Sequence, residues 1–212
     1  MISIIQGVAL TFLVVHSYDV LVSLRIAFWP YVVTGLATIL LFWSRSVIHT
    51  LTVIRWPLDL LHNFMYIACT LVEAVTFTQL TNVLNWYALN VLFGLTVFVL
   101  FALDLRMIRR RISDSPGPIG SRLFAIVECE QHLNLRFFMP AVMVFNLLAT
   151  IAVWSQRAFF IGEGNHLMMA LVQLAATLGY LFYVIRFFAR IVPLVVQTRQ
   201  EWREGVLPQT EK

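Results

Sequence analysis

Long apolar stretches, rather than any motif, decide what this chain can fold into. About six segments are each long enough to cross a bilayer, which takes roughly 20 apolar residues. The 212 residues are 60% hydrophobic and only 12% charged, about half the charged fraction of a soluble domain. Because so few charges cannot cover a surface that faces water, lipid must cover it instead. We therefore predict a polytopic membrane protein.

The predicted fold class is all-α, a transmembrane helical bundle of about six spans, because backbone groups in lipid must be hydrogen-bonded within the chain. The expected spans are residues 3–24, 27–43, 58–80, 86–105, 137–154 and 166–191. A polar connection is expected at residues 44–57, and a turn at residues 156–165. A transmembrane domain without re-entrant loops covers residues 1–198, and a polar cytoplasmic tail covers residues 199–212. The first segment has no basic flank or clear cleavage site, so we expect it to be retained.

The one long linker, SDSPGPIG at residues 113–120, contains two prolines and two glycines, which prevent a continuous helix. Residues 121–135 mix apolar with charged side chains, which is typical of a short amphipathic helix at the membrane interface. Residues 113–135 are therefore predicted to form a cytoplasmic linker followed by an interfacial helix.

The arginines predict how the bundle is oriented. Of the 15 basic residues, only Arg25 and Arg157 fall in connections on one side. The other thirteen fall in the gaps on the opposite side and in the tail: Arg45, Arg55, Arg106, Arg109, Arg110, Arg111, Arg122, Arg136, Arg186, Arg190, Arg199, Arg203 and Lys212. Basic connections stay in the cytoplasm, so both termini are expected there. The preference for arginine over lysine favours a bacterial inner membrane.

The third segment carries a polar stripe. Its members are spaced by four, three, four and three residues, and on a helix they fall within an arc of about 80°; they are His62, Tyr66, Cys69, Glu73 and Thr76. A charged side chain facing lipid costs about 2.5–3.5 kcal/mol or more, so the stripe must face other helices or water. Two interpretations remain open: the lining of a pore or cavity, or a structural interface between helices.

A second set of polar groups is expected in the outer half of the membrane. His16 and Asp19 lie on one surface of the first segment, and helix rise places His16 and Glu73 at similar depths, about 20 and 22 Å from the cytoplasmic end. Asn90 belongs to the same half. Together they predict an outward-facing vestibule that attracts cations or protons and in which His16 titrates near neutral pH. Alternatively, Asp19 is the interfacial end of its helix.

The leading functional hypothesis is a non-enzymatic membrane protein that forms or supports an ion-conducting homo-oligomer. Its polar residues would be His16, Asp19, His62, Tyr66, Glu73, Thr76 and Asn90. No zinc-binding HExxH, GxSxG elbow, phosphate-binding loop or CxxC pair occurs in the sequence, so neither a catalytic nor a metal site is assigned.

Arginines clustered on the predicted cytoplasmic face support a second hypothesis, a membrane anchor that recruits a soluble cytoplasmic partner. The candidate docking residues are Arg106, Arg109, Arg110, Arg111, Arg186 and Arg190. The simpler interpretation is contact with anionic phospholipid, worth about 1 kcal/mol for each arginine. Direct binding of nucleic acid is not expected.

The third hypothesis is an electron carrier with b-type haem. LHNFMY at residues 61–66 is similar to a short stretch of the haem-binding helix in ferric-reductase-like membrane cytochromes. Those helices carry a second histidine about fourteen residues further on, where this chain has Thr76. A pair of histidines at matched depth on facing helices would otherwise be needed, and His16 and His166 are the candidates.

The string IGEGN at residues 161–165 is similar to the filter strings of tetrameric cation channels. Those filters follow a pore helix of about a dozen residues, and none fits between Trp154 and Ile161. The fourth span also lacks a ladder of arginines through the membrane. We therefore interpret IGEGN as a glycine turn.

Overall fold

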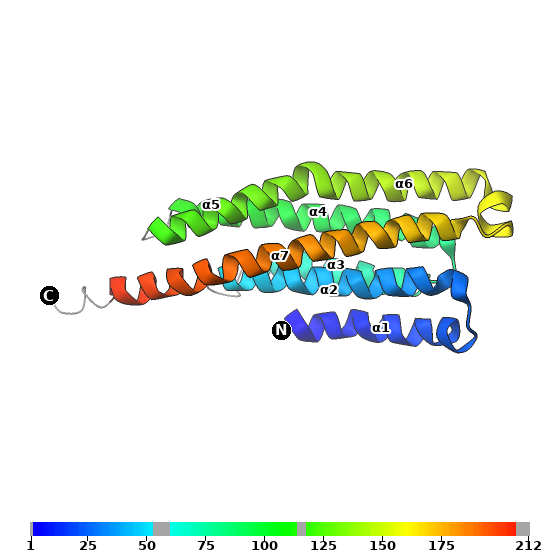
Figure 1. Cartoon of the computed structure of the whole chain (residues 1–212), viewed down its shortest axis with the longest axis horizontal. Helices are drawn as coiled ribbons and strands as arrows, with labels where there is room; N and C mark the ends of the chain where they lie inside the picture. Colours follow the sequence, from blue (N-terminus) through cyan, green and yellow to red (C-terminus); the bar gives the residue numbers. More distant parts are fainter. Residues whose placement is uncertain (1, 53–59, 114–117, 207–212) are drawn as a thin grey trace.

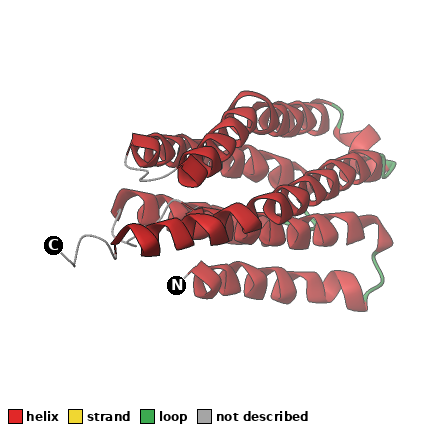
Figure 2. Cartoon of the chain, turned by 60° about the vertical axis from the view of Figure 1, so that its left-hand side comes forward, coloured by secondary structure: helices red, strands yellow, loops and turns green. Residues whose placement is uncertain are grey.

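The computed structural model describes residues 2–52, 60–113 and 118–206. These residues form a bundle of helices without strands (Figures 1 and 2). The long helices are α1 (Ile2–Val22), α2 (Trp29–Thr52), α3 (Leu60–Phe77), α4 (Val83–Ser113), α5 (Pro118–Leu133), α6 (Met139–Ser155) and α7 (His166–Val206). Three short helical turns are η1 (Ile26–Phe28), η2 (Asn134–Phe138) and η3 (Ala158–Gly162).

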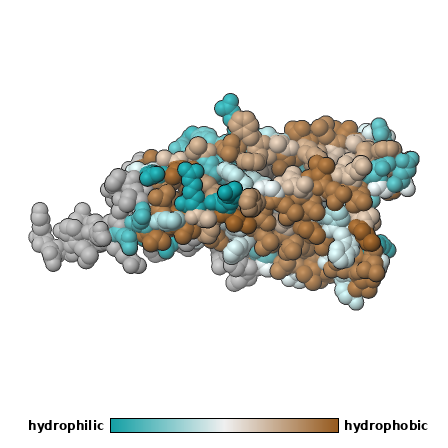
Figure 3. Space-filling view, viewed as in Figure 1, coloured by the Kyte–Doolittle hydropathy of each residue, from teal (hydrophilic) through white to brown (hydrophobic). Residues whose placement is uncertain are grey.

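The prediction of six spans in an all-α bundle is confirmed. Within the described residues, six helical segments are long and apolar enough to cross a membrane. They are Ile5–Val22, Ile26–Thr50, Leu60–Phe77, Val83–Arg110, Gly120–Ser155 and His166–Gln200. Apolar side chains cover most of the face in Figure 3, and hydrophilic ones gather towards the two ends. The chain is a multi-pass membrane protein.

The packing order places α1 against α2 and α3, and α3 against α4. Helix α4 also packs on α5 and α6, and α2 packs on α7. The start of α1 points towards the end of the bundle at which the connection from α4 to α5 and the end of α7 lie, although α7 extends well beyond it (Figure 1). This end also holds most of the arginines, and we call it the arginine-rich end. Because α1 begins and α7 ends on the same side of the bundle, the chain crosses it an even number of times.

Helix α2 extends further than the sequence analysis predicted. We expected a polar connection from residue 44, but the helix continues to Thr52. The physical reason is that Arg45 and His49 are buried, with 3% and 4% of their surface exposed, and lie against acidic side chains of other helices. They therefore act as interior residues rather than as loop residues. The remainder of that connection, residues 53–59, lies outside the described residues.

The helix that we predicted at residues 121–135 is present as α5, and it packs as part of the bundle. Helix α5 packs against α4 and α7, buries Leu123, Phe124 and Val127, and runs into α6 through the π-helical turn η2. Pro140, at the start of α6, has no backbone N–H, and its ring crowds the carbonyl four residues earlier. A wider π-turn at residues 134–138 accommodates both effects.

The connection between α6 and α7 is short: Ile161 and Gly162 of IGEGN end η3, and residues 163–165 form the turn that leads into α7. The segment forms only η3, and Gly164 adopts a φ of +75°, a conformation that glycine tolerates because it has no Cβ. The interpretation as a glycine turn is confirmed. At the other end of α7, the helix continues to Val206, so residues 199–206 of the expected tail are helical; residues 207–212 lie outside the described residues.

Candidate functional site

The polar stripe on α3 faces the interior of the bundle, as the sequence predicts. All five of its members have at most 8% of their surface exposed: His62, Tyr66, Cys69, Glu73 and Thr76. On the opposite side of the helix, Phe64, Leu71 and Val75 are 59%, 57% and 49% exposed. Helices α1 and α4 cover the polar side. We call these five residues the α3 stripe.

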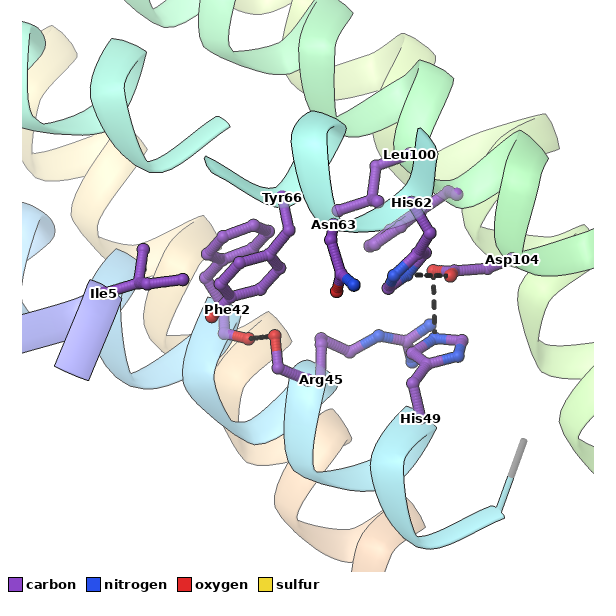
Figure 4. Close-up of a pocket in the computed structure, with 11 residues that line it drawn as sticks. Ile5, Phe42, Arg45, His49, His62, Asn63, Tyr66, Leu100 and Asp104 are labelled. Carbon is purple, nitrogen blue, oxygen red and sulfur yellow. Dashed lines mark hydrogen bonds and ion pairs between the residues drawn. The ribbon is translucent and has the colours of Figure 1, made fainter. Parts of the chain in front are cut away.

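At its end nearest the arginine-rich end, the α3 stripe meets a buried carboxylate. Asp104 on α4 lies between two imidazoles: His62 Nε2 is 2.9 Å from its Oδ1, and His49 Nε2 on α2 is 3.3 Å from its Oδ2. Figure 4 shows both rings directed at the carboxylate from different helices. We call these three residues the His–Asp cluster. A carboxylate buried to this depth is costly unless it is paired, and the two imidazoles supply partners.

A second buried ion pair lies beside the His–Asp cluster. Arg45 on α2 donates a hydrogen bond to Glu130 on α5, and its second terminal nitrogen donates one to Gln131 Oε1 at 2.6 Å. The guanidinium lies over the ring of Phe101, 5.1 Å from its centre. The Gln131 amide in turn donates to the backbone carbonyl of Phe101 at 2.9 Å. Helices α2, α4 and α5 are therefore held together by one set of hydrogen bonds.

The hydrogen bonds that link α2, α4 and α5 also extend to α7. Asn134, in the π-turn η2, donates to Glu130 at 2.7 Å and accepts a 2.7 Å hydrogen bond from the hydroxyl of Tyr180. Because η2 widens the helix at this position, Asn134 is fully buried between α5 and α7. We call Arg45, Glu130, Gln131, Asn134 and Tyr180 the Arg45 network.

A small cavity connects the His–Asp cluster with the α3 stripe. Its volume is about 30 Å³, and its lining includes Arg45, His49, His62, Tyr66 and Asp104. This is enough room for at least one water molecule, and polar side chains surround it, as a buried water requires. Figure 4 shows the ring of Tyr66 stacked on Phe42 at one side of this cavity.

Further along the α3 stripe, several buried polar atoms have no aligned hydrogen-bond partner. They are both carboxylate oxygens of Glu73, the hydroxyl of Tyr66 and the amide oxygen of Gln6. The Gln6 amide, on α1, donates to Thr70 at 3.3 Å and lies close to Glu73. Unpaired buried polar groups are rare in native proteins, and each calls for an explanation such as a water molecule or a functional role.

His16 and Asp19 do not join this arrangement. Both lie exposed on α1, and His16 stacks on Phe12. The buried side of α1 is formed by other residues: Gln6, Ala9, Leu13, Ser17 and Val20. The expected vestibule of His16, Asp19 and Glu73 is therefore not formed within one chain. Helix rise predicts only the spacing of residues along the axis, and it does not give their direction around the axis.

Asn90 and the pair of histidines proposed for haem lie elsewhere. Asn90, on α4, donates to the carbonyl of Trp86 at 2.8 Å and lines a larger cavity, described below. His166 is buried, and its Nδ1 is 3.1 Å from the hydroxyl of Tyr31. Since His16 is exposed, it does not face His166 across a cavity in the part of the bundle that the structure describes. The haem hypothesis stays a prediction, which a reduced-minus-oxidised absorbance spectrum tests.

The arginines predicted to contact lipid or a partner are mostly exposed. Arg106, Arg110, Arg186 and Arg190 are exposed, and Arg186 lies over the ring of Phe182. Arg109 is exposed too, but it donates to Glu128 at 2.9 Å and lies 2.9 Å from His132. The side chain of Arg111 lies outside the described residues.

Sequence reasoning missed most of the polar residues that the bundle brings together. Arg45 and His49 had been assigned to a loop, and Glu130, Gln131 and Asn134 to an interfacial helix. One available signal was Asp104, a single acidic residue inside an otherwise apolar span. A second was the spacing of four residues between Arg45 and His49, and again between Glu130 and Asn134, which places each pair on one side of a helix.

Comparison of the chain with protein-family models, with curated proteins and with solved structures gives no match. Any function must therefore be argued from the geometry of the site.

Proposed function

We propose that this protein conducts protons across the membrane along the α3 stripe. The observation that supports the proposal is the row of buried polar groups on one helix, from the His–Asp cluster to Glu73, in which several atoms have no partner. Intramembrane carboxylates and histidines are costly and typically mark ion or proton pathways. The proposal narrows the hypothesis of an ion-conducting protein to one ion and one helix.

The spacing of the row suits proton transfer. Neighbouring members are three or four residues apart, which is about 4.5–6 Å along the helix. One bridging water can span such a step, because two hydrogen bonds in series reach about 5.5 Å. The gap from His62 to Glu73 is about 16 Å in total, which is half of the hydrocarbon core.

At each end of the α3 stripe, further polar side chains continue the row. At the arginine-rich end, two imidazoles share one carboxylate, so a proton can reside on either ring while the cluster keeps a partner for its charge. At the other end, beyond Thr76, Gln79 accepts a hydrogen bond from Asn85 at 3.0 Å at the exposed tip of the bundle. The row lies within a single chain, so proton movement along it does not depend on the predicted homo-oligomer.

Proton flux into liposomes tests this proposal. Purified protein is reconstituted with a pH-sensitive dye inside, and a potassium gradient with valinomycin drives protons inward. We expect flux above that of empty liposomes, and a reduction of about tenfold or more in Glu73→Gln, which keeps the shape of the side chain but replaces its titratable carboxyl group with an amide. Asp19→Asn is the matched control, because Asp19 is exposed and outside the row; its flux should equal that of the parent. Equal flux in Glu73→Gln and the parent would refute the proposal.

One observation favours a second candidate, the membrane anchor. Arg106 and Arg110 are exposed at the arginine-rich end, where a soluble acidic partner could reach them from the cytoplasm, the side that we propose for this end. The native mass of the particle extracted in mild detergent tests this anchor function. A soluble subunit that co-purifies with the parent, and is lost from the double variant Arg106→Gln/Arg110→Gln, would support it. A particle that contains only this chain would contradict it.

A further inference from the structure

A second, larger cavity lies between α2, α4, α6 and α7. Its volume is about 630 Å³, within the range of about 300–1,000 Å³ that is typical of small-molecule sites. Helix α6 packs on α4 and α7 packs on α2, whereas α6 and α7 pack only sparsely on each other. Val142 on α6 and Val172 on α7 line the cavity and are 44% and 57% exposed. The cavity therefore opens sideways between α6 and α7, towards lipid.

The walls of this cavity are mainly apolar, with an aromatic group at one end. The apolar middle includes Phe93, Val97, Phe145, Ala176 and Gly179. Towards Arg45, the rings of Phe138 and Tyr180 lie 4.8 Å apart, and Tyr180 and Tyr183 are stacked at 6.1 Å. Flat aromatic surfaces of this kind favour a planar ring in the space beside them.

Two polar side chains in the wall have unused hydrogen-bonding atoms. Arg45 and Thr34, both on α2, line the cavity and are 3% and 2% exposed. The Nε of Arg45 and the hydroxyl oxygen of Thr34 have no hydrogen-bond partner. A buried polar group without a partner costs about 1–3 kcal/mol. These two side chains are about three helical turns apart, so one oxygen cannot partner both. A ligand that brings an oxygen to the end of the cavity near Arg45 provides a partner for its Nε.

The charge balance selects a neutral ligand. Arg45 is already paired with Glu130, so the wall carries no net charge here. An anionic head would leave one buried negative charge unpaired, which costs several kcal/mol. A neutral carbonyl oxygen can accept from the unused N–H without that penalty.

We propose that this cavity binds a lipid-soluble molecule with a planar, uncharged, carbonyl-bearing ring and an apolar tail, the chemistry of a membrane quinone. The ring lies among the aromatic side chains near Arg45, and the tail leaves between α6 and α7 into lipid. This inference rests on a different cavity from that of the α3 stripe and does not depend on proton conduction.

Equilibrium binding of a decyl-substituted benzoquinone to the full chain in detergent tests the proposal. Decanoate, with an equally long tail and an anionic head, is the matched ligand. We expect the quinone to bind with a dissociation constant in the micromolar range, and decanoate to bind at least about tenfold more weakly. Equal affinity for the two ligands, or no saturable quinone binding, would overturn the proposal.

A glycine substitution links binding to the cavity. A Cβ at Gly179 meets no atom within 4 Å, so a side chain can begin there without a clash. We expect Gly179→Leu to take up space in the cavity and to weaken quinone binding about tenfold or more. Gly7→Leu is the control, since Gly7 also has open space but lies on α1 outside the cavity; its affinity should equal that of the parent. Thermal unfolding confirms that both variants fold.

The mass of the native particle in the same preparation would reveal two alternative occupants of this cavity. A phospholipid retained at one copy per chain and lost in Gly179→Leu would overturn the quinone proposal. So would a dimer that the same substitution separates, because the groove would then be covered by a second copy of this chain.

Discussion

At the scale of single residues, the structure rests on buried charges that are matched with partners on other helices. Arg45 and Glu130 are the clearest case, each almost fully buried and each on a different helix. Removing one partner leaves the other charge buried and unpaired, which costs about 3–5 kcal/mol, whereas removing both costs little. Asp104 and its two imidazoles follow the same principle.

A double-mutant cycle tests this matching. We expect Arg45→Gln to lower the free energy of unfolding by about 3–5 kcal/mol, and Arg45→Gln/Glu130→Gln to recover most of the loss, since two neutral amides replace the two charges. Unfolding in mixed detergent micelles gives the values. If the double variant is as unstable as the sum of the two single variants, the ion pair does not have the role assigned to it.

Residues such as these mark the limit of what the sequence predicts. The stripe on α3 was predictable because its spacing is local, and one helix is enough to define it. The partners of Asp104 were not, because His49 and His62 come from two other helices and only packing brings them together. Likewise, Arg45 looks like a loop residue until its acidic partner on α5 is known.

At the scale of elements, helix α3 has two faces that differ sharply in their surroundings. Cys69 is fully buried on the polar face, and Leu71 and Val75 are exposed on the other. The direction of this helix around its own axis decides whether the α3 stripe can form a pathway. It is also the feature of the fold on which the proton proposal most depends.

Cysteine modification tests that direction. Native Cys69, in a background of Cys129→Ala, should react slowly with a membrane-permeant maleimide. A cysteine at position 71, in the variant Leu71→Cys/Cys69→Ala/Cys129→Ala, should react at least about tenfold faster, because its side chain points away from the bundle. Rates are measured by mass spectrometry in native membranes. Faster reaction at Cys69 than at Leu71→Cys would show that α3 is rotated.

At the scale of the whole molecule, orientation follows from the uneven distribution of arginines. We propose that the arginine-rich end faces the cytoplasm of a bacterial inner membrane. Sequence alone gave the number of spans correctly, because hydropathy acts over whole segments. It did not give the sparse packing between α6 and α7, since this depends on the shapes of four helices at once.

A pair of exposed positions tests the orientation. In Cys69→Ala/Cys129→Ala, Gln156→Cys lies at the end with few arginines and Gln200→Cys near the end of α7. We expect a membrane-impermeant maleimide to label Gln156→Cys from outside intact spheroplasts, and Gln200→Cys only in inverted vesicles. The reverse pattern would contradict a cytoplasmic location of the arginine-rich end.

The most direct measurement of the central claim is the reversal potential of the current through the purified protein in a planar bilayer. With a tenfold proton gradient and equal concentrations of other ions, conduction of protons alone predicts a reversal potential of about 59 mV. The current should be largely lost in Glu73→Gln and retained in Asp19→Asn. A reversal potential that follows a potassium or sodium gradient, or no current above that of the bare bilayer, would contradict the account.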